Sequence, residues 1–188
     1  MDNPATLLVA IMFVTILAIA VGNILMTCAE IAGGLRHPMP DRIQLSWIFF
    51  MLFALLNLFW ETTALLEVES WLFVEFLYVI AGPMLLLFAT SVITSPARDQ
   101  QSVQSHDHYF ELCRRFFIML ALHEAWILGI DFRYASLSAM SLISAAMLFL
   151  FLILAFSSSL RVHVAGASLI WSGYIVALIV RTLGTTGA

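Results

Sequence analysis

Long apolar runs alternate with short polar segments along the whole chain. A hydrocarbon core roughly 30 Å thick requires about 20 apolar residues in a helical span. The pattern predicts an all-α, polytopic transmembrane helical bundle that forms a single transmembrane domain over residues 1–188. Its six predicted spans cover residues 6–28, 45–65, 71–93, 109–131, 137–157 and 164–183.

The polar segments predict how these spans connect. The first connection contains Gly33-Gly34 and two prolines, which are residues typical of loops. Only residues 66–70 separate the second span from the third, so these two spans are expected to be antiparallel neighbours. The longest polar stretch, residues 94–107, is predicted to be a cytoplasmic linker.

The arginines predict an orientation, because short cytoplasmic loops of membrane proteins are enriched in arginine and lysine. Six spans would place on one side Arg36, Arg42, Arg98, Arg114, Arg115 and Arg161, and on the other only Arg133 and Arg181. We therefore predict that the six-arginine side is cytoplasmic and that both termini face outward.

Composition agrees with a lipid environment and excludes several functions. Of the 188 residues, 62% are hydrophobic and 11% charged, against about 25% charged in soluble domains. The net charge of −4 is dispersed, so the lipid bilayer is an expected partner and nucleic acid is not. All eight basic residues are arginine, which excludes chemistry that needs a lysine amine, such as retinal or pyridoxal Schiff bases.

Four carboxylates fall in the predicted outer halves of three spans. An ionisable group inside a membrane costs about 2.5–3.5 kcal/mol on insertion scales, so each one is a functional candidate. Glu61 has Asn57 one turn below it on the same helix face, and Glu75 lies about one turn inside the third span. Glu124 and Asp131 are seven residues apart and so share a face of the fourth span. We expect the four acids to converge on an outer vestibule that attracts cations or holds protons.

A helix break adds to this expectation. Pro83, which follows Gly82, removes the backbone hydrogen bond to the carbonyl of Val79, one turn from Glu75. Free carbonyls and carboxylates are both cation ligands, and broken helices are common where ions pass. The alternative is structural: carboxylates at helix ends lie at headgroup level or pair with arginine, and Glu124 would be a protonated or arginine-paired contact inside the bundle.

Enzymatic signatures are weak, and we expect no catalytic residue and no cofactor. His123-Glu124 begins like a zinc-protease motif, but position 127 is isoleucine where the second histidine belongs. His123 and His163 lie at different depths in the predicted spans, so they cannot hold one haem between them. Enzyme is therefore the minority class, represented by an intramembrane enzyme or a binder of lipid or quinone.

Metal-ligating residue types gather at the start of the fourth span. His106, His108 and Glu111 are weak candidates for a metal site, because their spacing matches no standard site. The pattern favours a solvated helix start instead.

Small residues recur on single faces of three spans, where they favour close helix packing. They are Ala18, Gly22 and Ala29, then Ser138, Ser141 and Ser144, and finally Gly166, Gly173 and Ala177. Packing within one chain is the favoured interpretation, and a homo-oligomer interface is the alternative.

Several sequence features also resemble a family. Trp47, Trp60-Glu61, Pro83, His108-Tyr109-Phe110 and the run from Arg114 to Phe117 occur in that order. Over roughly residues 6–130 the chain resembles an uncharacterised group of small multi-pass inner-membrane proteins of proteobacteria. The resemblance implies a bacterial inner (plasma) membrane and no particular activity.

Two functions follow as hypotheses. The first is a small cation- or proton-conducting, or ion-coupled, transport protein with an acidic vestibule on the periplasmic side. The second is a non-transporting accessory or sensory subunit that acts through its helix faces and the cytoplasmic segment 94–115, with structural carboxylates.

Overall fold

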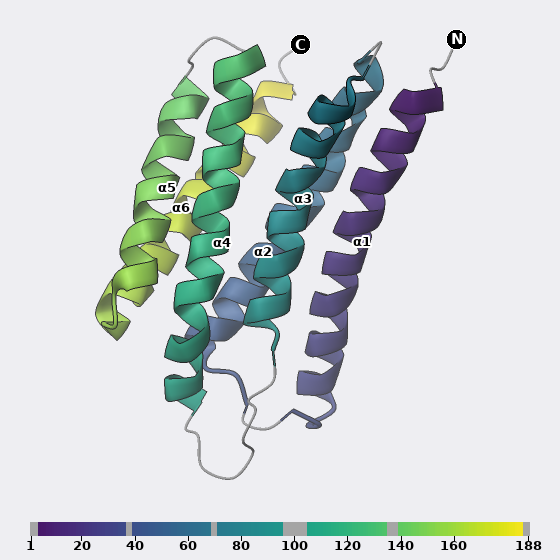
Figure 1. Ribbon diagram of the computed structural model, residues 1–188. Coiled ribbons are helices and arrows are strands. Elements are labelled where there is room, and N and C mark those ends of the chain that lie inside the picture. Colours follow the sequence, from purple (N-terminus) through teal and green to yellow (C-terminus); the bar gives the residue numbers. More distant parts are fainter. Residues whose placement is uncertain (1–3, 37–38, 69–70, 96–104, 135–138, 186–188) are drawn as a thin grey trace.

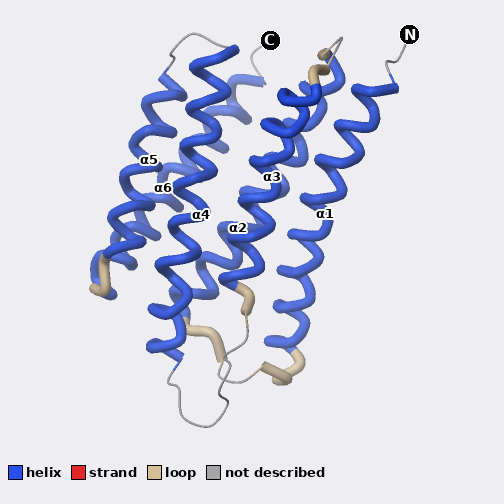
Figure 2. Tube along the Cα trace, in the orientation of Figure 1, coloured by secondary structure: helices blue, strands red, loops and turns tan. Residues whose placement is uncertain are grey.

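The computed structural model describes residues 4–36, 39–68, 71–95, 105–134 and 139–185. In these ranges the chain is all-helical, as predicted, and contains no strand (Figure 2). The α-helices are α1 (Pro4–Ala32), α2 (Arg42–Glu61), α3 (Phe73–Ile93), α4 (Ser105–Tyr134), α5 (Ala139–Phe156) and α6 (Leu160–Thr185). A 3-10 helix, η1 (Thr62–Glu67), continues α2, where the sequence predicted one helix to residue 65. Helix α4 begins four residues earlier than predicted.

Successive helices run antiparallel and form two layers. Helices α5, α4, α3 and α1 lie side by side in front, with α6 and α2 behind them (Figure 1). The start of α1 and the end of α6 lie at one end of the bundle, which we call the terminal end. The opposite end carries the connections from α1 to α2 and from α5 to α6, and we call it the arginine end.

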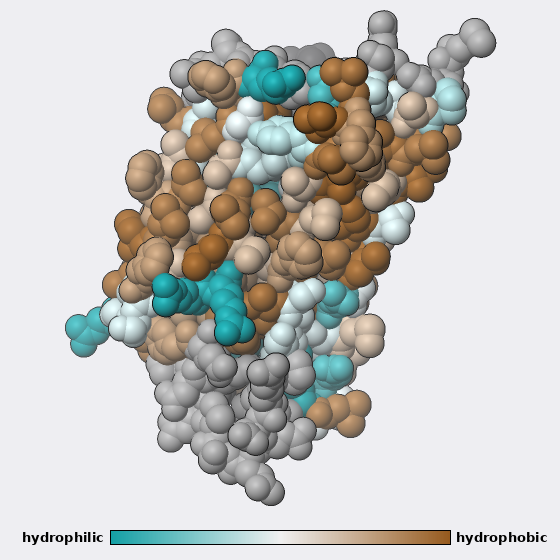
Figure 3. Space-filling model, in the orientation of Figure 1, coloured by the Kyte–Doolittle hydropathy of each residue, from teal (hydrophilic) through white to brown (hydrophobic). Residues whose placement is uncertain are grey.

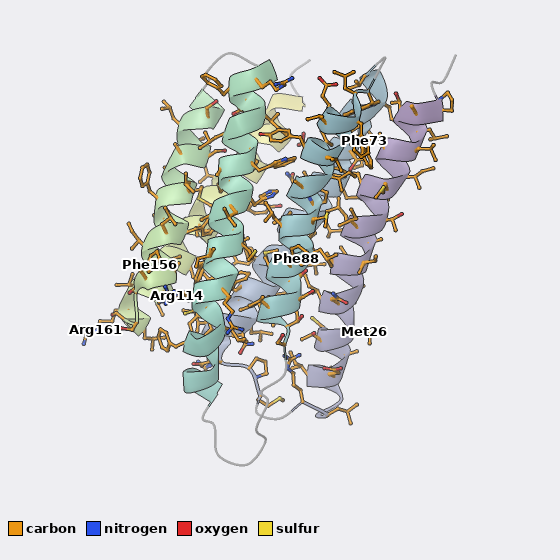
Figure 4. The ribbon with its side chains drawn as sticks, in the orientation of Figure 1. Met26, Phe73, Phe88, Arg114, Phe156 and Arg161 are labelled. Atoms are coloured by element: carbon orange, nitrogen blue, oxygen red, sulfur yellow. The ribbon has the colours of Figure 1, made fainter. Side chains whose placement is uncertain are left out.

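The described arginines justify this name. Arg36 and Arg42 lie in or beside the connection from α1 to α2, and Arg161 is in the first turn of α6. Arg114 stands over the ring of Phe156 on α5, with its guanidinium carbon 5.3 Å from the ring centre (Figure 4). Basic groups therefore gather at the arginine end from three helices and from the connection between α1 and α2.

Large aromatic side chains fill the centre of the bundle toward the arginine end. Trp47 on α2 meets Phe117 on α4 edge to face, with ring centres 4.9 Å apart, and Phe116 at 6.0 Å. All three side chains are fully buried. Such edge-to-face pairs stabilise a core by about 0.5–1.5 kcal/mol beyond the area they bury.

Side chains from other helices bind the last carbonyls of α3. Arg36 is buried and donates from Nη2 to the carbonyl of Thr94 over 2.6 Å. Gln44 donates to the carbonyl of Ile93 over 2.9 Å. Burial lowers the pKa of the Arg36 guanidinium, and Glu30 at 3.6 Å opposes that shift. These bonds hold α3 in register with its neighbours, because the end carbonyls of a helix have no partner within it.

On the face shown in Figure 3, apolar residues dominate the middle of the bundle and polar groups lie above and below them. Helices α1, α2 and α3 are long and apolar enough to cross a membrane. Within α5 and α6, the segments Ser141–Phe156 and Leu160–Val176 are also apolar. Soluble monomers rarely expose apolar patches of more than a few hundred Å². The exposed leucine, isoleucine and phenylalanine side chains on these helices therefore indicate a helical membrane protein.

Candidate functional site

A cavity of about 490 Å³ lies among α1, α2, η1, α3 and α4 toward the terminal end. Most of the residues that line it are apolar. Two are acidic, Glu61 at the end of α2 and Glu75 in the first turn of α3. We call it the acidic cavity. The fold thus brings together two carboxylates that are 14 residues apart in the sequence.

Glu75 has structural partners as well as its place in the cavity. Its Oε2 accepts a hydrogen bond from the backbone N–H of Leu72 over 3.2 Å, so the side chain caps the start of α3. Its Oε1 lies 3.9 Å from Nη2 of Arg133 at the end of α4. Arg133 is 63% exposed and Glu75 is 25% exposed. This ion pair is therefore solvent-screened and of the kind that contributes about 0–1 kcal/mol.

Glu61 and Asn57 differ in their relation to the cavity. Glu61 is exposed and lines it, whereas Asn57 is exposed on α2 and is not among the lining residues. Val79 lines the cavity, one turn along α3 from Glu75, as the sequence placed it. The residue whose carbonyl Pro83 leaves without a helical donor is thus in the cavity wall.

The other two predicted carboxylates face α5 instead. Ser141 donates from its hydroxyl to Oδ2 of Asp131 over 2.7 Å, and Glu124 faces Ser144. The sequence predicted that Glu124 and Asp131 share a helix face, and both indeed have partners on α5. Neither lines the acidic cavity. The four acids therefore divide into two pairs on opposite sides of α4.

Helices α3 and α4 pack closely around the Gly82-Pro83 segment. The indole N–H of Trp126 donates to the carbonyl of Tyr78 over 2.6 Å, and the Tyr78 hydroxyl donates to the carbonyl of Trp126 over 3.2 Å. Nδ1 of His123 lies 3.3 Å from the carbonyl of Gly82, and it carries the proton, because a carbonyl only accepts. A side chain at Gly82 or Gly129 would overlap Trp126 or Tyr78.

A buried polar pair that the sequence did not reveal links α4 to α6. Nε2 of His163 lies 3.0 Å from the carbonyl of Ser157, so that nitrogen carries the proton and Nδ1 accepts. The hydroxyl of Tyr109 donates to Nδ1 over 2.7 Å. The indole N–H of Trp47 faces the same hydroxyl but falls short of hydrogen-bond geometry. No spacing in the sequence connects these residues, which only the packing brings together.

The metal site suggested by the sequence stays a prediction. The side chains of His106, His108 and Glu111 lie outside the described residues. Within the part of the chain that is described, no group of three or more histidine, cysteine or acidic residues could hold a metal ion.

Comparisons with protein-family models, with curated proteins and with solved structures give no match for this chain. The acidic cavity has two carboxylates and an apolar wall, and aromatic rings fill the centre of the bundle toward the arginine end. These three properties decide which chemistry it can perform.

Proposed function

We propose that the protein is an ion-coupled membrane transport protein for small cations, and that the acidic cavity is its outer vestibule. The observation that carries this proposal is that Glu61 and Glu75, from different helices, line one cavity. Paired carboxylates give the cavity a negative potential, which concentrates cations at its mouth.

The orientation that this function needs is supported by the arginines. Arg36, Arg42, Arg114, Arg115 and Arg161 gather at the end of the bundle opposite the acidic cavity, whereas Arg133 and Arg181 lie on helices near the terminal end. In the proposal the arginine end is cytoplasmic, all six helices span a bacterial inner membrane, and the cavity opens to the periplasm.

A carrier fits the core better than an open channel. Trp47, Phe116 and Phe117 fill the centre of the bundle between the cavity and the arginine end, and all three are fully buried. An ion would have to displace these rings to cross a static bundle. Transport therefore requires helix movement, for which we propose the Gly82-Pro83 segment of α3 as the hinge.

Glu124 is the second acidic position in this proposal. It is partly buried within α4, next to His123, and faces Ser144 on α5. Acidic residues inside spans mark proton and ion pathways in many transporters. We assign Glu124 the coupling role, in which movement of α4 against α5 exposes it to one side at a time.

Flux into liposomes tests the proposal. Purified protein should pass protons or metal cations above the rate of empty liposomes. Glu61→Gln, Glu75→Gln and Glu124→Gln should each lower this flux. Glu30→Gln at the arginine end is the matched control and should leave it unchanged. Flux equal to that of empty liposomes would refute the proposal.

The second candidate is an accessory or sensory subunit that does not transport. Arg114 and Arg115 are adjacent and exposed near the arginine end, within the 94–115 segment. They offer a basic surface to an acidic partner. A stoichiometric partner recovered in mild detergent, and lost when segment 94–115 is replaced, would favour this function. Residues 96–104 of the segment lie outside the described residues.

A further inference from the structure

The wall of the acidic cavity is aromatic as well as acidic. Phe13 from α1, Trp71 just before α3 and Trp126 from α4 line it together with Glu61 and Glu75. Its volume of about 490 Å³ falls within the roughly 300–1,000 Å³ of small-molecule sites. The cavity has room for an organic molecule and far more than a bare ion needs.

The composition of the wall also limits which chemical class of ligand the cavity can bind. Calcium takes about six to eight oxygen ligands, and magnesium keeps several of its waters, so at a mostly apolar wall either ion stays hydrated and is attracted by the carboxylates without being bound tightly. Carboxylates repel anions. A neutral apolar molecule would leave the carboxylates without a role in binding. A cation that carries apolar groups satisfies both parts of the wall, because aromatic faces attract positive charge and bury apolar surface at the same time.

We propose that the acidic cavity binds an organic ammonium ion bearing apolar groups, with Glu61 and Glu75 flanking its charge and the aromatic rings of Phe13, Trp71 and Trp126 surrounding its apolar part. This inference rests on the proposed function, because it names the substrate class of the same vestibule.

Arg133 would compete with this ligand for the carboxylate of Glu75. Its guanidinium lies 3.9 Å from Oε1 of Glu75 and is mostly exposed, so it can move away without leaving a buried charge unpaired. The other oxygen of Glu75 stays bonded to the backbone N–H of Leu72. The ligand thus replaces one exposed partner of Glu75 and leaves the cap of α3 intact.

The test uses the full-length chain in lipid nanodiscs and a pair of matched probes. Benzyltrimethylammonium is the charged probe, and neopentylbenzene is its uncharged carbon isostere. In calorimetric titrations corrected for empty nanodiscs, the charged probe should saturate at one per chain. The isostere should show no saturable binding, since it partitions into lipid but lacks the charge.

Variants identify the cavity as the binding site. Combining Glu61→Gln with Glu75→Gln should weaken binding about tenfold or more, while glutamine at 75 can still accept the bond from Leu72. Trp71→Leu should weaken it at least about threefold through loss of the π face. Its indole nitrogen has no hydrogen-bond partner, so the change breaks no such bond. Glu30→Gln should bind like the unchanged protein.

The outcomes separate this inference from the proposed function. It is overturned if the charged probe shows no saturable binding, if the isostere binds as tightly, or if the double variant binds unchanged. Should the double variant fail to fold, Glu61→Gln alone decides, because Glu61 is an exposed residue at the end of α2. Probe binding without ion flux would overturn the proposed function and leave this inference standing. Ion flux without probe binding would overturn this inference and leave the proposed function standing.

Discussion

Gly82→Ala tests how closely α3 and α4 are packed. A methyl group at position 82 would lie 2.5 Å from the Cζ2 and Cζ3 atoms of Trp126. Carbon atoms at ideal contact are about 3.5–4.0 Å apart, so one partner has to move. The indole cannot rotate away freely, because its N–H is held by the carbonyl of Tyr78 over 2.6 Å.

The expected loss of stability combines opposing effects. Overpacking of a dense core costs about 1–3 kcal/mol. Losing the Trp126 hydrogen bond adds about 0.6 kcal/mol, the average for such bonds in a membrane. Alanine offsets part of this, because it favours a helix interior by up to about 1 kcal/mol over glycine. The net expectation is a destabilisation of about 1–3 kcal/mol.

The free energy of unfolding can be measured by denaturing the protein in mixed micelles and following tryptophan fluorescence. Gly22→Ala is the matched control, because a Cβ at position 22 of α1 would meet no atom within 4 Å. This control should be neutral or stabilising. Adding Trp126→Phe to Gly82→Ala should recover part of the loss, since phenylalanine lacks the outer ring of the indole. Equal effects of Gly82→Ala and Gly22→Ala would refute the close packing of α3 on α4.

Three further changes test polar contacts by the same unfolding measurement. Tyr109→Phe should destabilise the protein by about 1–3 kcal/mol, because it leaves Nδ1 of buried His163 without its donor. Arg36→Ala should cost a similar amount through loss of the buried charged donor at the end of α3. Ser144→Ala should cost only about 0.6 kcal/mol in stability but alter the flux that depends on Glu124.

Each of these three changes has a control elsewhere in the bundle. Tyr174→Phe removes an exposed hydroxyl that is bonded to the carbonyl of Phe53, and should cost less than Tyr109→Phe. Arg42→Ala removes an exposed arginine near the same end and should change stability by less than about 0.5 kcal/mol. Ser168→Ala removes a hydroxyl bonded within its own helix and should leave flux unchanged. Controls as harmful as the test variants would contradict the assigned contacts.

The sequence determined where the helices lie along the chain, because the length and spacing of apolar runs depend only on the order of neighbouring residues. Each of the six predicted spans corresponds to a helix. The common face of Glu124 and Asp131 followed from their seven-residue spacing, because an α-helix nearly repeats every seven residues. The placement of Val79 one turn from Glu75 was likewise a local property, and α3 continues as one helix through Pro83.

The tertiary structure decided which acids meet. Glu61 and Glu75 line one cavity because α3 lies beside α2 and η1 continues α2 along the cavity wall. Glu124 and Asp131 face serines on α5 because α4 is rotated to place Trp126 over Gly82. The rotation of a helix about its axis depends on the shapes of its neighbours, which are distant in sequence. Spacing alone therefore predicted a shared face and could not identify the helix or cavity that the face would meet.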